Sequence, residues 1–194
     1  MASPLQPRSR VLRLAGSVLT CAVATGLLAG CGGDDTKSAS PTPSTSAPVS
    51  TSPSASDADQ AAKDDVLAAY TNMREIQIKM AADGDLHTQD LAKYAKGDAA
   101  AELKKSVLRN RSLGIKFTGR PEMDPQVTSV DTQKKTATLS DCFDATKWTP
   151  VYTKSGKPVE LAKQRLKYPV TSQATLEGDT WLITKITADR TKGC

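Results

Sequence analysis

The spacing of apolar residues changes at Gly114, and this change constrains the fold more than any other feature of the chain. Before Gly114 the apolar residues recur every three or four positions, as they do on one face of a helix. They are Val66, Tyr70, Met73, Ile76 and Met80. After Gly114 apolar and polar residues alternate, as they do on a strand with one buried face. A chain that forms helices first and antiparallel strands afterwards is an α+β protein.

Residues that begin and end helices divide the chain into predicted elements. Three helices are expected: one from Asp57 or Asp59 to about Ala82, a short one beginning at Thr88, and one capped by Asp98. Strands are expected at residues 115–118, 126–130, 135–143, 148–153, 168–177 and 180–188, separated by turn-forming residues. We predict that these strands form a curved antiparallel meander with one face buried against the helices.

The first 30 residues have the three zones of an export signal. Arg8, Arg10 and Arg13 precede an apolar run that ends at Leu28-Ala29-Gly30-Cys31. The run is as long as a transmembrane helix, but Gly, Ser and Thr dilute it. This composition favours a signal peptide that is cleaved over a permanent membrane span.

The four residues Leu28-Ala29-Gly30-Cys31 resemble the lipobox of bacterial lipoproteins. The resemblance implies that Cys31 receives a diacylglyceryl group and that the signal peptidase cuts in front of it. Acyl chains such as palmitate would then hold the protein on the extracytoplasmic face of the cell membrane. The alternative is an ordinary signal peptide in which the cysteine is incidental.

Residues 31–58 are expected to comprise the lipidated Cys31 and a disordered tether that follows it. From Ser38 to Ser56 the chain consists of eight Ser, three Thr, four Pro, three Ala and one Val. Such a composition has almost nothing to bury and cannot offset the entropy of ordering. The remaining 136 residues, 59–194, have the usual size of one domain.

The predicted domain carries a small positive charge that is spread along the sequence. It has 22 Lys and Arg against 18 Asp and Glu, a net charge of +4. Interspersed charges are typical of a solvated surface, and contact with anionic headgroups or wall polyanions is the alternative. Nucleic acid is not an expected partner, because the chain has a predicted export signal and only two Phe, four Tyr and two Trp for stacking.

Two cysteines, Cys142 and Cys194, remain once the signal peptide and Cys31 are set aside. In an oxidising exterior they are expected to form a structural disulfide. A zinc pair or a nucleophilic cysteine would need partners, but the chain has one histidine, His87, and no CxxC motif. We therefore expect no metal and no cofactor.

Three features of the predicted domain carry a family resemblance. They are the order of helices and strands, the segment Glu177-Gly178-Asp179-Thr180-Trp181-Leu182-Ile183-Thr184, and the placement of Asp141-Cys142 and Cys194. In these the domain resembles the NTF2-like group, which includes SnoaL and ketosteroid isomerase relatives, and especially its small exported actinobacterial lipoproteins. The resemblance implies a cone between helices and sheet, and a homodimer through the sheet as a candidate assembly. It does not choose a function, since the group includes isomerases, hydrolases, ligand binders and interaction modules.

We expect a non-catalytic binding or accessory module of the cell envelope, whose partner is an envelope protein or a small apolar ligand. The ligand would occupy the cone, lined by residues such as Tyr70, Leu139, Tyr168 and Trp181. Packing in the core is the alternative role of these four residues. The domain has no Ser-x-x-Lys motif, no Gly-x-Ser-x-Gly elbow and no phosphate-binding glycine loop, which argues against hydrolases and nucleotide enzymes.

An isomerase or dehydratase that uses a carboxylate inside the cone is the alternative function. Asp141 is the candidate, because strand alternation places it on the face that carries Leu139 and Phe143. Tyr70 and His87 are its candidate partners. In the structural alternative, Asp141 lies at the rim of the sheet and caps a neighbouring group or pairs with a lysine, and His87 lies in a surface loop.

Overall fold

The structure, a computed structural model, describes residues 55–194, and three helices open this segment. They are α1 (Ala55–Asp83), α2 (Thr88–Leu91) and α3 (Gly97–Ser112). Helix α1 begins before the predicted start at Asp57 or Asp59, so the last residues of the predicted tether are helical. The export signal, Cys31 and the tether up to residue 54 lie outside the described residues.

The apolar stripe predicted on the first helix is confirmed as the buried face of α1. Val66, Tyr70, Met73 and Met80 are fully buried, and Ile76 packs at the edge of the same cluster. Burial of side chains of this size stabilises a fold by about 1.5–3 kcal/mol each, which fixes this face of α1 against the rest of the domain. The helix therefore forms because its apolar face is covered.

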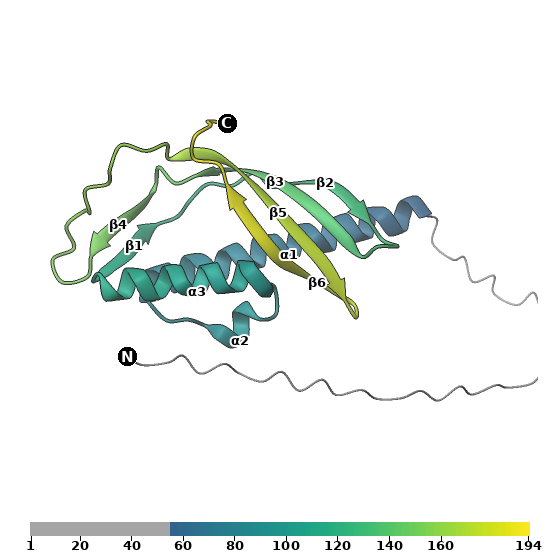
Figure 1. Cartoon of the computed structure of the whole chain (residues 1–194), viewed down its shortest axis with the longest axis horizontal. Helices are drawn as coiled ribbons and strands as arrows, with labels where there is room; N and C mark the ends of the chain where they lie inside the picture. Colours follow the sequence, from purple (N-terminus) through teal and green to yellow (C-terminus); the bar gives the residue numbers. More distant parts are fainter. Residues whose placement is uncertain (1–54) are drawn as a thin grey trace, which may run out of the picture. The chain divides into compact units, whose positions relative to one another are not determined.

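Six strands form two antiparallel sheets, so the α+β class is confirmed (Figure 1). The larger sheet has the order β2-β3-β5-β6, and β1 pairs with β4 in the smaller one. The bounds are β1 Ile115–Gly119, β2 Gln126–Asp131, β3 Thr136–Asp144, β4 Trp148–Tyr152, β5 Lys167–Glu177 and β6 Thr180–Ala188. Helices α1 and α3 both contact β6 and β1, so they lie against both sheets.

The predicted single meander is wrong at β4. This strand does not pair with its sequence neighbours β3 and β5, but with β1. At the last residue of β3, Asp144 exchanges two backbone hydrogen bonds of 2.9 Å with Glu122, which brings the segment after β1 beside the end of β3. Gly119 makes the close approach at this point: it has φ +76°, and a Cβ there would lie 2.0 Å from the carbonyl oxygen of Lys147. Only glycine accepts both conditions.

Register shifts curve the larger sheet. The β5–β6 pairing slips between Gln173 and Ala174, and the β2–β3 pairing slips between Val127 and Ser129. Bulges of this kind bend a strand and increase its twist. Two of the three pairings in the sheet therefore carry a bend.

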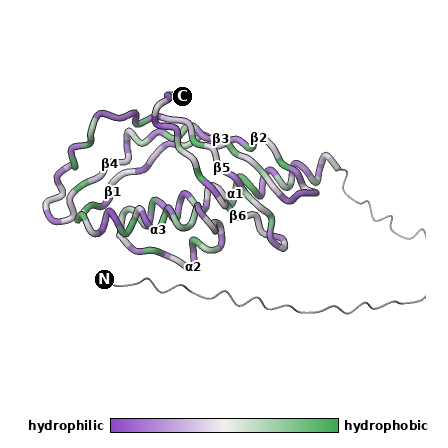
Figure 2. The backbone as a smooth tube through the Cα atoms, viewed as in Figure 1, coloured by the Kyte–Doolittle hydropathy of each residue, from purple (hydrophilic) through white to green (hydrophobic). Residues whose placement is uncertain are grey.

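The core divides into two clusters. The larger lies between α1, α3 and the sheet and includes Leu139, Trp181 and Ile183. The smaller consists of Phe143, Tyr168 and Val170, with Trp148 packed against it. Hydrophobic and hydrophilic residues alternate along α3, whereas the connection between β4 and β5 is mainly hydrophilic (Figure 2).

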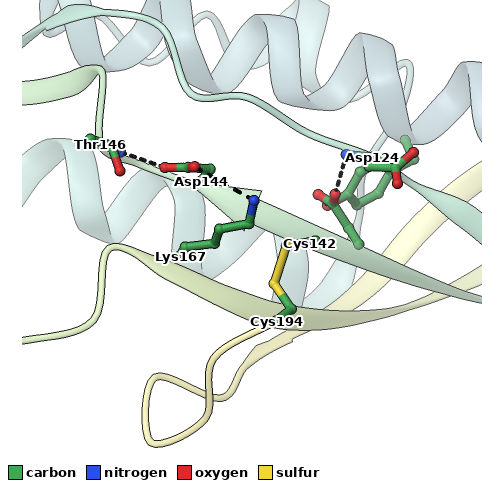
Figure 3. Close-up of a disulfide and its surroundings, with 8 residues drawn as sticks. Asp124, Cys142, Asp144, Thr146, Lys167 and Cys194 are labelled. Atoms are coloured by element: carbon green, nitrogen blue, oxygen red, sulfur yellow. Dashed lines mark hydrogen bonds and ion pairs between the residues drawn. A yellow bond between two sulfur atoms is a disulfide. The ribbon is translucent and has the colours of Figure 1, made fainter.

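The predicted disulfide is confirmed: Cys142 in β3 is bonded to Cys194, the last residue of the chain (Figure 3). Their Cα atoms are 5.9 Å apart, within the usual range for a disulfide. Cys142 alternates with Asp141 and Phe143, so its side chain lies on the opposite face of the strand from the core. The disulfide therefore ties the C-terminal segment to the outer face of the sheet.

Candidate functional site

A cleft of about 690 Å³ lies where the helices, the larger sheet and the β1–β4 pair meet. Its lining comes from α1 and α3, from β1 and β4, from the ends of β3, β5 and β6, and from the β4–β5 connection. Small-molecule sites in proteins have volumes of about 300–1,000 Å³. The cleft is therefore large enough for a ligand of ordinary size.

Four aromatic side chains from four different strands line the cleft in a continuous row. Phe117 of β1 contacts Trp148 of β4, with ring centroids 4.6 Å apart. Phe143 of β3 lies 5.9 Å from Trp148 and 5.6 Å from Tyr168 of β5. The row gives the cleft one extended apolar wall, and rings at these spacings support one another.

Leucines stand exposed at the cleft. Leu113 is 59% exposed, Leu161 48% and Leu166 37%, and all three line it. Leu113 follows α3, whereas Leu161 and Leu166 belong to the β4–β5 connection. Apolar side chains left in water beside an apolar cavity extend the surface that a ligand would cover.

Arg74 of α1 also lines the cleft, although it is only 4% exposed. Its Nε donates a hydrogen bond of 2.9 Å to the hydroxyl of Tyr70, and its Nη1 donates one of 2.6 Å to Gln77. Its guanidinium carbon lies 4.9 Å from the ring centroids of both Tyr70 and Phe143. Its Nη2 is buried and has no hydrogen-bond partner in the structure.

Asp141 is buried behind Arg74 and is joined to it through Tyr70. The Tyr70 hydroxyl donates a hydrogen bond of 2.6 Å to Asp141 Oδ2, and the backbone N–H of Asp124 donates one of 2.8 Å to Oδ1. Asp141 is 4% exposed, so the predicted position on the core face is confirmed and the rim position paired with a lysine is wrong. Each carboxylate oxygen already accepts a hydrogen bond from the protein.

The two buried phenols of this region ionise less readily than free tyrosine. Burial raises the pKa of Tyr70 well above its usual value, and the hydrogen bond to Asp141 acts in the same direction, while the charge of Arg74 opposes it. Burial also raises the pKa of Tyr168, against the nearby charge of Arg190. The Tyr70 hydroxyl therefore stays protonated at physiological pH and donates a hydrogen bond to Asp141.

The structure separates the four residues predicted to line the cone. Tyr168 lines the cleft, and its hydroxyl accepts a hydrogen bond of 2.8 Å from Arg190. Tyr70, Leu139 and Trp181 do not line it and lie in the larger core cluster, which was their alternative role. Sequence reasoning missed Arg74, Phe117 and Trp148.

His87 does not join Asp141, so one of the two predicted partners is wrong. Its Nε2 lies 2.6 Å from Asp83 Oδ2, in the turn between α1 and α2. The backbone N–H of Asp85 donates to the other oxygen of Asp83. Within residues 55–194, Asp83, Asp85 and His87 are the one group of three side chains spaced to hold a cation. The hydrogen bonds of Asp85 and His87 to the Asp83 carboxylate stabilise the turn, and this role explains why the three residues lie together.

Comparison with known proteins places the chain in no family. No family model matches the sequence, and no curated protein matches it. Among solved structures, the crystal structure of the intermembrane space region of the chloroplast protein ARC6 is similar, at 11% identity and a TM-score of 0.47. The match covers 67% of this chain and 95% of that one.

None of the helices within residues 55–194 is both long and apolar enough to cross a bilayer.

Proposed function

We propose that this protein is a lipid-anchored extracytoplasmic lipoprotein whose NTF2-like domain binds a small apolar ligand in the cleft. The aromatic row and the exposed leucines are the observation that carries the proposal. A cleft of about 690 Å³ with such a lining would bury most of a small molecule. The binding module is therefore favoured over a domain that acts only through its outer surface.

The position of Asp141 supports binding over the isomerase alternative. A general acid or base must reach the proton that it moves, directly or through one water. Asp141 does not line the cleft, and both of its oxygens accept hydrogen bonds from Tyr70 and Asp124. Its role as the structural counter-charge of Arg74 accounts for a carboxylate on the core face.

Filling the cleft tests the binding proposal. Nile red, a neutral apolar dye, should bind the exported chain (residues 32–194) at one site and gain fluorescence. Ser106→Trp places an indole in the cleft from an exposed position of α3, and it should weaken binding at least about tenfold, a loss of about 1.4 kcal/mol.

Leu108→Trp is the matched control, since Leu108 is 47% exposed on the same helix and does not line the cleft. It should leave the affinity for the dye unchanged. Equal binding by both tryptophan variants, or no saturable binding at all, would contradict the proposal.

Replacing the predicted lipidation residue tests the anchor. Cys31→Ala removes the thiol that would carry the diacylglyceryl group, and without acyl chains the exported domain has no stable attachment to the bilayer. Fractionation of cells should find the wild-type protein in the membrane and the variant outside it. A processed Cys31→Ala protein that stays in the membrane fraction would refute lipid anchoring.

A further inference from the structure

We infer that the ligand of the cleft is an amphiphile with a carboxylate head, which Arg74 binds while the aromatic row covers the apolar body. The inference rests on the proposed binding function and names the chemical class of its ligand. The observation behind it is a buried nitrogen of the Arg74 guanidinium that has no hydrogen-bond partner in the structure.

Arg74 has donor capacity that the protein leaves unused. An arginine has five N–H donors, and in this one Nε and Nη1 each serve one acceptor, Tyr70 and Gln77. Nη2 is buried without an acceptor, and the side chain belongs to the lining of the cleft. A buried donor without a partner is costly, so an acceptor supplied by a ligand would be bound strongly.

The surroundings of Arg74 stabilise its charge without completing its hydrogen bonds. The rings of Tyr70 and Phe143 lie at cation–π distance, but a ring face gives an N–H no full acceptor. Among residues 55–194, no carboxylate lies within ion-pair distance of Arg74, and Asp141 reaches it only through the Tyr70 hydroxyl. A ligand carboxylate would supply both the missing acceptor and a direct counter-charge.

The rest of the lining favours an anion over a cation. Besides Arg74, the cleft is lined by Arg109 and Arg190, and its one acidic lining residue is Glu102. Glu102 lies 3.4 Å from the ammonium group of Lys105, which offsets its charge. Positive potential in an apolar cleft raises the local concentration of negatively charged ligands.

The size of the polar group points to a carboxylate. One guanidinium with one unused nitrogen matches a head that carries a single charge, whereas a phosphate monoester carries up to two charges and three acceptor oxygens. Phe143 lies against Arg74 and is also a member of the aromatic row, in which it contacts Trp148. The carboxylate head of a ligand on Arg74 and its apolar body on the aromatic row would therefore lie next to each other.

Two ligands that differ only in the head group test the inference. Dodecanoate and dodecan-1-ol are titrated into residues 32–194, which include every residue that the structure describes, and heats or tryptophan fluorescence are recorded. Dodecanoate should bind at least about tenfold more tightly than the alcohol, as expected for one charge-assisted hydrogen bond. Dodecyl phosphate should bind no more tightly than dodecanoate.

Arg74→Gln should remove the preference for the acid, so that the acid and the alcohol bind the variant within about twofold of each other. Arg111→Gln, an exposed position of α3 outside the cleft lining, is the control and should keep the preference. Because Arg74 belongs to a buried network, the variant can fail to fold. The side-chain N–H signals of ¹⁵N-arginine in the wild-type protein then decide: Arg74 should shift with dodecanoate and stay in place with the alcohol.

Each other outcome has one meaning. Equal binding of acid and alcohol, or tighter binding of dodecyl phosphate, overturns the carboxylate inference and leaves the apolar cleft as proposed. A preference for the acid that survives Arg74→Gln, or Arg74 signals that do not respond to dodecanoate, also overturns it. Absence of binding by both ligands and by Nile red instead refutes the proposed function itself.

Discussion

Replacing Asp141 with alanine should lower the free energy of unfolding by about 3–5 kcal/mol. The substitution leaves the buried charge of Arg74 without its counter-charge, and it removes the acceptor of both the Tyr70 hydroxyl and the Asp124 backbone N–H. Asp141→Asn keeps an acceptor oxygen but loses the charge, so its loss should be smaller, about 1–3 kcal/mol. Urea unfolding followed by circular dichroism measures both values.

Asp65→Ala is the control for this prediction, because Asp65 is an exposed carboxylate of α1 away from the network. It should change the stability by less than about 0.5 kcal/mol. If Asp141→Ala were as stable as Asp65→Ala, the buried network would not be the structural unit that the geometry indicates. The isomerase or dehydratase function of Asp141 would then again be a candidate.

Loss of the Cys142–Cys194 disulfide should have an effect of similar size. The bond joins residues separated by 52 positions, and closing a loop of that length in the unfolded chain corresponds to about 4 kcal/mol in the chain-entropy model. Cys194→Ser should therefore lower the urea midpoint strongly, because the terminal segment is then free of β3. Addition of a reductant should lower the wild-type midpoint to the same value.

The double variant Cys142→Ser/Cys194→Ser controls for effects of the reductant on the rest of the protein. Its midpoint should not respond to reductant, since no disulfide remains to be broken. A wild-type midpoint that is identical in oxidising and reducing buffer would show that the disulfide contributes nothing measurable.

Much of the fold could be predicted because local patterns determine it. The stripe Val66, Tyr70 and Met73 identified the buried face of α1, and strand alternation identified the buried face of β3. The pairing of β4 with β1 could not be predicted, because period-two patterns show which face of a strand is buried and not which strand lies beside it. The close approach of Gly119 to Lys147 appears only when both segments are placed.

The candidate site was predicted less well, for a related reason. The Tyr70–Asp141 contact was among the expected pairs, since both residues occupy buried faces. Arg74 was missed, although it follows Tyr70 by four positions and so falls on the same face of α1. A charge on an apolar helix face was the available signal. Phe117 and Trp148 gave no signal, because the cleft that they line is formed by long-range strand pairing.

Native mass spectrometry shows whether the cleft holds a small molecule in the protein as it is made by the cell. The chain without its predicted signal peptide and lipidation cysteine (residues 32–194) would be purified from its own host and measured under native and denaturing conditions. We predict a native mass that exceeds the denatured mass by a small-molecule adduct, and the loss of this adduct in Ser106→Trp. Identical native and denatured masses per chain in the wild-type protein would contradict the proposed binding.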